Sequence, residues 1–215
     1  MPPTGAPTEA PLGLVLSCHG ASVPAMNQAR AYARKDDFAI VAALNRRPYG
    51  FDWQDWGRRD AYEVLERGVA LSGVSRDRLY LLGHSMGGHG ALTLALKNPD
   101  RFRSVSAFAP ICHPVDVPWG TKAFSNYLGD DRAAWAAHDA TELVKTKPTG
   151  HHILIDQGEA DQFLAEQLRP EAFAAACDAA GQRCTLRMQP GYDHSYFFIS
   201  SFMEDHIRFH CEQLA

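Results

Sequence analysis

Short apolar runs alternate with longer segments of helical periodicity along most of the chain. The apolar runs have the length of typical β-strands, and their residues do not switch between apolar and polar as they do in a half-exposed sheet. Strands are predicted over Leu12–Ser17, Phe38–Ala43, Arg78–Leu82, Ser104–Ala109, His152–Asp156 and Cys184–Gln189. Helices are predicted over Asp55–Leu71, Ser85–Asn98, Glu171–Ala180 and Ser195–Cys211.

This order of elements predicts an α/β fold. Strands that alternate with helices pair in parallel, because each helix carries the chain back to the start of the next strand, and the helices then cover both faces of the sheet. Burial on both faces explains why the strands are continuous apolar runs. We therefore expect a mostly parallel central sheet of about six strands, with functional groups at the carboxyl ends of the strands.

Length and composition indicate one domain. A chain of 215 residues, of which 46% are hydrophobic, suits a single buried core. Residues 1–11 are rich in proline, threonine, alanine and glycine and predict a flexible lead-in, so the domain is expected over residues 12–215. Residues 111–140 contain several prolines and two tryptophans, and we expect an excursion there that caps a cleft.

Charge, hydropathy and cysteine content indicate the kind of partner and the cellular location. The chain has 21 lysines and arginines against 25 aspartates and glutamates, and these residues are interspersed, so we expect no nucleic-acid partner. No apolar run approaches the roughly 20 residues of a membrane span, so we expect no membrane partner and a small-molecule substrate. The five scattered cysteines favour reduced thiols and a cytoplasmic location, and a disulfide between Cys177 and Cys184 is the less favoured alternative.

The segment Gly83-His84-Ser85-Met86-Gly87 directly follows a predicted strand and directly precedes a predicted helix. This context predicts a nucleophile elbow, in which a strained backbone lifts the Ser85 hydroxyl above the sheet. Glycines are needed on both sides, because a β-carbon there would strike the strand or the helix. The amide of Met86 lies at the helix N-terminus and is predicted to bind an oxyanion. A plain structural turn is the alternative.

A serine nucleophile needs a histidine base and a carboxylate that orients the base, and in such a fold they follow in the order serine, acid, histidine. His194 lies between the last predicted strand and the last helix and is predicted to be the base; the alternative is a helix cap. The loop after the fifth strand offers two main candidates for the acid. Asp161, farther from the strand, is preferred over Asp156.

Further residues are predicted to shape the site. Ser17-Cys18-His19-Gly20-Ala21 resembles the histidine–glycine signature of many esterases, which makes the Ala21 amide the second oxyanion donor. Trp119, Phe124 and Tyr192 are predicted to contact substrate, with Tyr127 and Tyr196 as further candidates.

No cofactor or metal is predicted. His206 and His210 are four residues apart on a helix, but a metal needs a third ligand, so both are expected at ordinary, partly exposed positions.

From about residue 77 to its end, the chain resembles S-formylglutathione hydrolase, also called esterase D. The segments that carry the resemblance are Gly83–Leu92, Phe108–Pro114, Pro118–Phe124, Tyr127–Gly129, Ile155–Gly158, Asp161–Leu164 and Gly191–Ile199. The resemblance implies an α/β-hydrolase fold and cofactor-free hydrolysis of S-formylglutathione, with side activity on short acyl esters. It also places the catalytic carboxylate at Asp161.

The front of the chain departs from that pattern, because the segments ahead of residue 77 are shorter than in that family. Residues 19–22 and 45–53 are more similar to prolyl-oligopeptidase-like hydrolases. Arg46, Arg47 and Trp53 are expected in a solvated turn, and contact with an acidic or aromatic substrate is the alternative. The leading function is therefore a serine thioesterase or esterase. The alternatives are a general carboxylesterase for short-chain or aryl esters, an acyltransferase and, from another class, a non-catalytic binding protein of the same fold.

Overall fold

A computed structural model describes residues 13–32, 38–45, 53–54 and 56–213. Within them, six strands form one sheet in the order β2-β1-β3-β4-β5-β6, and every neighbouring pair is parallel. The strands are β1 (Gly13–Cys18), β2 (Phe38–Ala42), β3 (Leu79–His84), β4 (Ser104–Phe108), β5 (Ile153–Gly158) and β6 (Cys184–Gln189). This arrangement confirms the predicted α/β fold.

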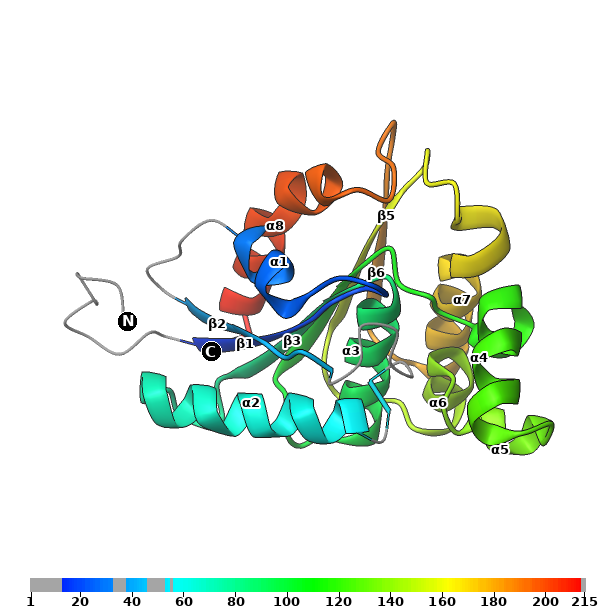
Figure 1. Ribbon diagram of the computed structural model, residues 1–215. Helices are drawn as coiled ribbons and strands as arrows, with labels where there is room; N and C mark the ends of the chain where they lie inside the picture. Colours follow the sequence, from blue (N-terminus) through cyan, green and yellow to red (C-terminus); the bar gives the residue numbers. More distant parts are fainter. Residues whose placement is uncertain (1–12, 33–37, 46–52, 55, 214–215) are drawn as a thin grey trace.

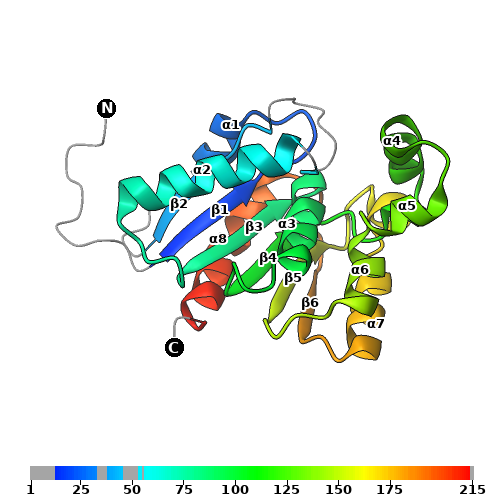
Figure 2. The same cartoon turned by 90° about the horizontal axis from the view of Figure 1, so that it is seen from below.

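Helices cover both faces of the sheet. They are α1 (Ala25–Arg30), α2 (Trp56–Ser72), α3 (Met86–Lys97), α4 (Pro118–Leu128), α5 (Arg132–Ala136), α6 (Ala140–Thr146), α7 (Pro170–Ala180) and α8 (Tyr196–Cys211), together with a 3₁₀ turn η1 (Pro114–Asp116) and a π-helical turn η2 (Leu164–Leu168). Helices α1 and α8 lie on one face, and α2, α3 and α7 lie on the other (Figures 1 and 2). None of the helices in the described part of the chain has the length and apolar character needed to cross a membrane.

Strand β1 shows why the sheet strands are apolar runs. Leu14 and Leu16 point into the core beneath α2 and α3, whereas Val15 between them points into the core beneath α8. All three side chains are fully buried. Because successive side chains of a strand point to opposite faces, a strand covered on both sides has no polar face.

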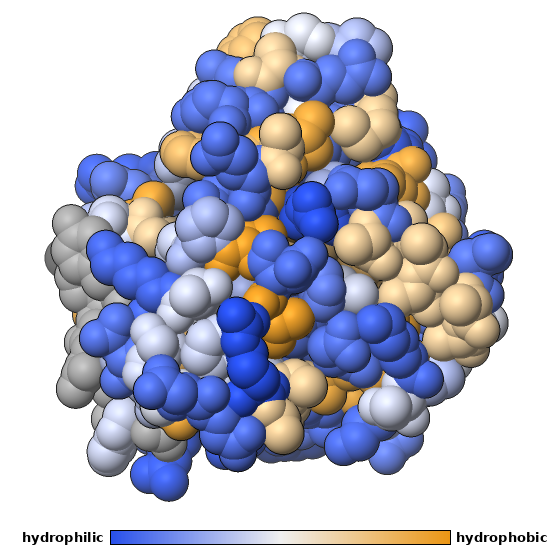
Figure 3. All heavy atoms as spheres, turned by 90° about the vertical axis from the view of Figure 1, so that its right-hand side faces the viewer, coloured by the Kyte–Doolittle hydropathy of each residue, from blue (hydrophilic) through white to orange (hydrophobic). Residues whose placement is uncertain are grey.

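The bounds of the predicted strands and helices agree with the structure to within two residues, but α1, α4, α5 and α6 were not predicted as helices. Helix α1 has six residues and no helical hydrophobic period. The predicted excursion, residues 111–140, contains η1, α4 and α5, which lie beside one another at one end of the molecule (Figure 1). On the face that carries α4 to α7, hydrophilic side chains cover most of the surface (Figure 3). The predicted lead-in, residues 1–11, lies outside the described residues.

The expectation of a solvated turn at Trp53 is wrong. Its side chain is fully buried, and its Nε1–H donates to the carbonyl oxygen of His19 at 3.2 Å. The ring edge also packs on the His19 ring, with 5.0 Å between the ring centroids. Trp53 therefore supports the loop after β1. Arg46 and Arg47 lie outside the described residues.

The expectation of partly exposed positions for His206 and His210 is also wrong. His210 is fully buried and contacts the Ser104 and Ser106 hydroxyls at 2.8 and 3.0 Å. His206 is fully buried, stacks on Phe108, and its Nε2 lies 3.0 Å from Asp156 Oδ2. Hydrogen bonding lets both imidazoles enter the core, which the helical pattern did not reveal.

Asp156 is the centre of a buried polar network. Arg187 reaches its carboxylate with two donors, Nε at 2.7 Å and Nη2 at 2.5 Å, and Gln189 donates at 3.1 Å. Burial opposes ionisation of the carboxyl, but the hydrogen bonds from His206 and Arg187 outweigh it and lower its pKa to about 2. Burial lowers the pKa of His206, so its imidazole is neutral and Arg187 is the charged partner.

This network predicts acid sensitivity. The Asp156 pKa falls from its usual 3.8 to about 2 on folding, so the ionised form adds about 2 kcal/mol to the free energy of unfolding. That contribution is complete above pH 3.8 and is lost as the pH falls through 2. In urea titrations, the stability difference between wild type and Asp156→Asn should stay constant from pH 7 to 5 and shrink below pH 4. A difference that is independent of pH would contradict the assignment.

Candidate active site

Ser85 is the single residue between β3 and α3. Its backbone has φ 56° and ψ −120°, a conformation that non-glycine residues rarely adopt. Hydrogen bonds hold it there: the Ser85 amide donates to Phe108 O at 2.9 Å, and the Ser85 carbonyl accepts from His89 N at 3.1 Å and Ile111 N at 3.3 Å. The strained elbow expected from the sequence is thus present.

The glycines beside Ser85 allow close backbone contacts. A Cβ atom at Gly83 would lie 2.0 Å from the carbonyl oxygen of Gly87, and one at Gly87 would lie 2.1 Å from the carbonyl oxygen of Cys18. Neither neighbour is a flexible side chain, so any larger residue would push β3, α3 or the loop after β1 apart. The motif therefore fixes the position of Ser85 relative to that loop.

His194 and Asp161 come from different loops and meet beside Ser85. His194 Nδ1 lies 2.6 Å from Asp161 Oδ2, and Asp161 also accepts from the Phe163 amide at 2.8 Å and from Gln157 Nε2 at 3.1 Å. Burial opposes ionisation of Asp161, but the hydrogen bonds, above all that with His194, lower its pKa below the usual value. A charged carboxylate favours a proton on Nδ1, which leaves Nε2 as an acceptor.

Asp156 does not lie with these residues. Its carboxylate is committed to Arg187, His206 and Gln189, and it does not line the pocket around Ser85. Of the two candidate carboxylates, the structure brings only Asp161 to His194.

The two predicted oxyanion donors both line the pocket. The amide of Met86 opens α3 and therefore has no acceptor within the helix. Ala21 follows His19, whose ring nitrogens contact the carbonyl oxygens of Gly20 at 2.7 Å and Leu44 at 3.0 Å. A Cβ atom at Gly20 would lie 3.4 Å from Ser85 Cβ, so this loop passes directly beside the serine.

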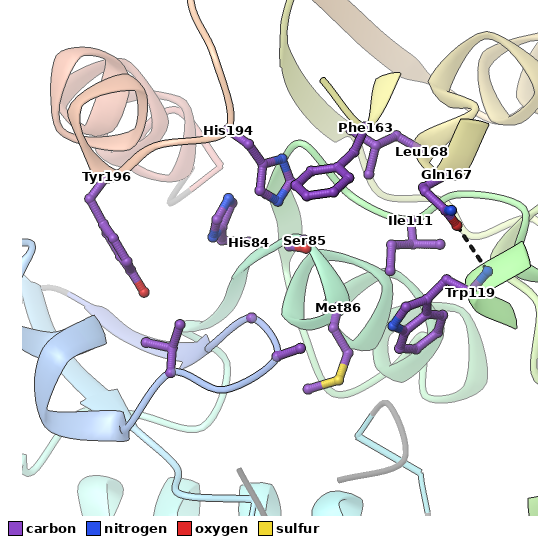
Figure 4. Close-up of a pocket in the computed structure, with 13 residues that line it drawn as sticks. His84, Ser85, Met86, Ile111, Trp119, Phe163, Gln167, Leu168, His194 and Tyr196 are labelled. Atoms are coloured by element: carbon purple, nitrogen blue, oxygen red, sulfur yellow. Dashed lines mark hydrogen bonds between the residues drawn. The ribbon is translucent and has the colours of Figure 1, made fainter. Parts of the chain in front are cut away.

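A cavity of about 410 Å³ opens over Ser85. Its lining residues are Gly20, Ala21, Val23, His84, Ser85, Met86, Ile111, Trp119, Phe163, Gln167, Leu168, His194 and Tyr196 (Figure 4). Most are apolar, and among the residues that the structure describes no lysine, arginine, aspartate or glutamate lines the cavity. Such a lining suits an uncharged organic group.

Of the three aromatic residues predicted to contact substrate, the structure places only Trp119 in this cavity. Phe124 is fully buried on the inner side of α4, where its ring packs edge-on against Trp135. Tyr192 packs against Phe197, Phe198 and Phe202. Phe124 and Tyr192 are therefore corrected to packing positions. Of the further candidates, Tyr196 lines the cavity and Tyr127 does not.

Two rings that lie beside His194 were not predicted from the sequence. His84 is buried, and its ring centroid lies 4.6 Å from that of His194; burial lowers the pKa of His84 to about 3, so it is neutral. Phe163 meets His194 edge-on at 5.0 Å. Figure 4 shows the His194 ring between them, above Ser85. The position of His84 next to the serine was the available signal, whereas Phe163 precedes a π-helical turn that has no sequence pattern.

One group in the described part of the chain has metal-ligand geometry. Ligand atoms of His113, Asp139 and Glu142 lie within 4.8 Å of one another. However, Asp139 already accepts from the amides of Val115 and Glu142 at 3.0 Å each, and from His113 Nδ1 at 3.1 Å. The hydrogen bond to Asp139 raises the pKa of His113. These contacts identify the cluster as the N-terminal cap of α6, outside the pocket.

Comparisons with known proteins agree with this geometry. Residues 49–209 match the esterase family, described as "Putative esterase". An S-formylglutathione hydrolase of Paracoccus denitrificans is 57% identical over 142 residues, which are 66% of this chain and 50% of the relative. One of Arabidopsis thaliana is 47% identical over 183 residues, 83% of this chain and 64% of the relative.

A solved S-formylglutathione hydrolase from Agrobacterium tumefaciens superposes with a TM-score of 0.83 at 36% identity and covers 96% of this chain and 86% of its own. The chain thus spans half to two thirds of the curated relatives, and the similarity extends ahead of residue 77. With the elbow at Ser85 and the parallel sheet, these matches show that the chain belongs to the esterase family, in the group of the S-formylglutathione hydrolases.

Proposed function

We propose that this chain is a serine hydrolase that cleaves small thioesters or carboxylic esters through an acyl-enzyme, with S-formylglutathione as its leading substrate. The observation that carries the proposal is the 2.6 Å contact between His194 Nδ1 and Asp161 Oδ2 in the loops around the Ser85 elbow. The similarity to S-formylglutathione hydrolases of Paracoccus denitrificans and Arabidopsis thaliana supports the choice of substrate.

In the acylation step, His194 Nε2 takes the proton of the Ser85 hydroxyl as Oγ attacks the carbonyl carbon of the substrate. Asp161 keeps the proton on Nδ1 and stabilises the imidazolium that forms. The tetrahedral intermediate then collapses, and His194 returns its proton to the departing thiol or alcohol. The acyl group remains on Ser85.

The amides of Met86 and Ala21 stabilise the oxyanion of the tetrahedral intermediate. Both residues line the cavity beside Ser85, and the Met86 amide adds the positive end of the α3 dipole. Removing one donor of such a pair typically lowers kcat by about 10²- to 10³-fold.

Deacylation repeats the chemistry with water as the nucleophile. His194 Nε2 takes a proton from the water, the hydroxide adds to the acyl carbon, and the second tetrahedral intermediate expels Ser85 Oγ. The proton on His194 passes to Oγ and restores the free enzyme. Every step uses protein groups and water, so the proposed mechanism needs neither cofactor nor metal.

The character of the cavity favours a second candidate, a carboxylesterase for short-chain or aryl esters. Trp119 and the other apolar lining residues offer contacts to an uncharged acyl or aryl group. Glutathione, in contrast, carries carboxylate and ammonium groups, which would lie beyond this lining.

The ratio of kcat/KM for S-formylglutathione to kcat/KM for p-nitrophenyl acetate tests the leading substrate. We expect the thioester to be preferred by at least about tenfold, a difference that needs only a modest gain in transition-state binding. An equal or lower value for the thioester would assign the chain to the carboxylesterase candidate. If neither compound is hydrolysed, the chain is a non-catalytic member of the fold.

We also propose a cytoplasmic location. All five cysteines are free thiols in the structure, and Cys18, Cys112 and Cys177 are buried. Reduced thiols are typical of proteins in reducing compartments.

A further inference from the structure

One side of the cavity is built from two segments that are far apart in sequence. Trp119 comes from the first turn of α4, whereas Phe163, Gln167 and Leu168 come from the loop and π-helical turn after β5. In Figure 4, these residues lie on the same side of Ser85, and one hydrogen bond crosses between the two segments. The amide of Trp119 donates to Gln167 Oε1 at 2.9 Å.

This bond replaces a missing helix cap. The amides of the first turn of a helix have no acceptor within the helix, and a serine, threonine, aspartate or asparagine before the helix usually supplies one. Helix α4 follows Val117, whose side chain has no oxygen, and no side-chain cap is formed. Gln167 therefore provides the acceptor from another segment and ties the Trp119 backbone to η2.

Other contacts join the same regions but do not reach Trp119. The Cys112 amide donates to Leu168 O at 2.7 Å, ahead of η1. On the surface, Arg169 Nη2 donates to Asp116 Oδ2 at 2.9 Å. Both contacts fix η2 against the start of the excursion, whereas the Gln167 bond fixes the first turn of α4.

We propose that Gln167 is a specificity-determining positioning residue, because it holds the Trp119 backbone in place. Trp119, Phe163 and Leu168 form an apolar wall of the cavity, and the position of Trp119 sets how much room this wall leaves for the acyl chain of the substrate. This inference rests on the proposed hydrolysis at Ser85. A formyl or acetyl group is too short to extend far along this wall, whereas longer acyl chains contact it. The effect of a Gln167 substitution on kcat/KM should therefore grow with acyl length. Without the hydrogen bond from the Trp119 amide, the first turn of α4 can shift and leave more room for a long acyl chain.

The test compares p-nitrophenyl acetate, butyrate and hexanoate, which share one leaving group. Gln167→Leu removes the acceptor, and Gln167→Asn keeps an amide that is one methylene too short to reach Trp119. In both variants, the hexanoate-to-acetate ratio of kcat/KM should rise by about fivefold, the factor that corresponds to one net hydrogen bond.

Two matched variants separate positioning from general stability. Gln167→Glu keeps an acceptor oxygen of the same reach for the Trp119 amide, and its hexanoate-to-acetate ratio should lie closer to wild type than that of Gln167→Leu or Gln167→Asn. Asp116→Asn weakens the neighbouring Arg169 contact without touching Trp119 and should retain the wild-type ratio.

A ratio that stays constant in both Gln167→Leu and Gln167→Asn would overturn the proposal, as would a loss of kcat/KM that is equal for all three esters. If Gln167→Leu does not fold, the Asn and Glu variants give the same comparison. Acetate hydrolysis by wild type, and its loss in Ser85→Ala, tests the proposed function separately.

Discussion

Replacement of Ser85 by alanine is expected to lower kcat for p-nitrophenyl acetate by about 10⁶-fold, the loss typical of a serine nucleophile. Without Oγ no acyl-enzyme forms, and His194 has no hydroxyl to activate. The rate that remains reflects water attack assisted by the amides of Met86 and Ala21. Steady-state kinetics, with mass spectrometry of the stopped reaction, measure the rate and the acyl adduct on Ser85.

Ser200→Ala is the matched control, because this serine is exposed on α8 and its hydroxyl donates to the Phe197 carbonyl oxygen at 2.9 Å. It should keep wild-type kinetics, while His194→Ala should lose nearly as much activity as Ser85→Ala. Thermal unfolding of each variant checks that the fold is intact. Wild-type turnover in folded Ser85→Ala would refute the serine mechanism.

The elbow could be predicted because its requirements are local. Gly83, Ser85 and Gly87 lie within five residues, between an apolar run and a helical segment, and the close contacts at both glycines explain the spacing. Predicting His194 and Asp161 required one more rule, which is that the acid and then the histidine follow the serine along the chain in such a fold. Their 2.6 Å contact depends on β5 and β6 being neighbours, which the sequence pattern alone does not specify.

The walls of the cavity could not be predicted in the same way. Phe124 and Trp119 are both aromatic residues of α4, but one faces the protein interior and the other the cavity, and the choice depends on how α4 docks. Phe163 and Gln167 belong to a loop and a π-helical turn without hydrophobic periodicity. Trp53, with φ 59°, resembled a polar turn because its neighbours are polar. Tertiary packing, not local pattern, positions these side chains.

Asp161 and Asp156, five residues apart at the end of β5, are expected to respond in opposite ways to the same substitution. In Asp161→Asn, the amide can present its N–H groups to His194 Nδ1, which drives the proton to Nε2 and removes the acceptor that Ser85 needs. The expected loss in kcat is about 10⁴-fold at neutral pH. The free energy of unfolding should change little by comparison, because Asn can still accept from the Phe163 amide.

Asp156→Asn is expected to keep kcat within about tenfold of wild type, because this carboxylate contacts Arg187 and His206 and does not contact His194. It should instead lower the free energy of unfolding by about 2 kcal/mol, which corresponds to a fall in Tm of about 4–8 °C for a chain of this size. Measuring kcat and Tm for both variants separates the carboxylate that serves the chemistry from the one that serves the fold. If Asp156→Asn lost the activity and Asp161→Asn lost the stability, the acid of the proposed mechanism would be Asp156. That outcome would require the loop after β5 to rearrange in solution, because in the structure Asp161 alone of the two reaches His194.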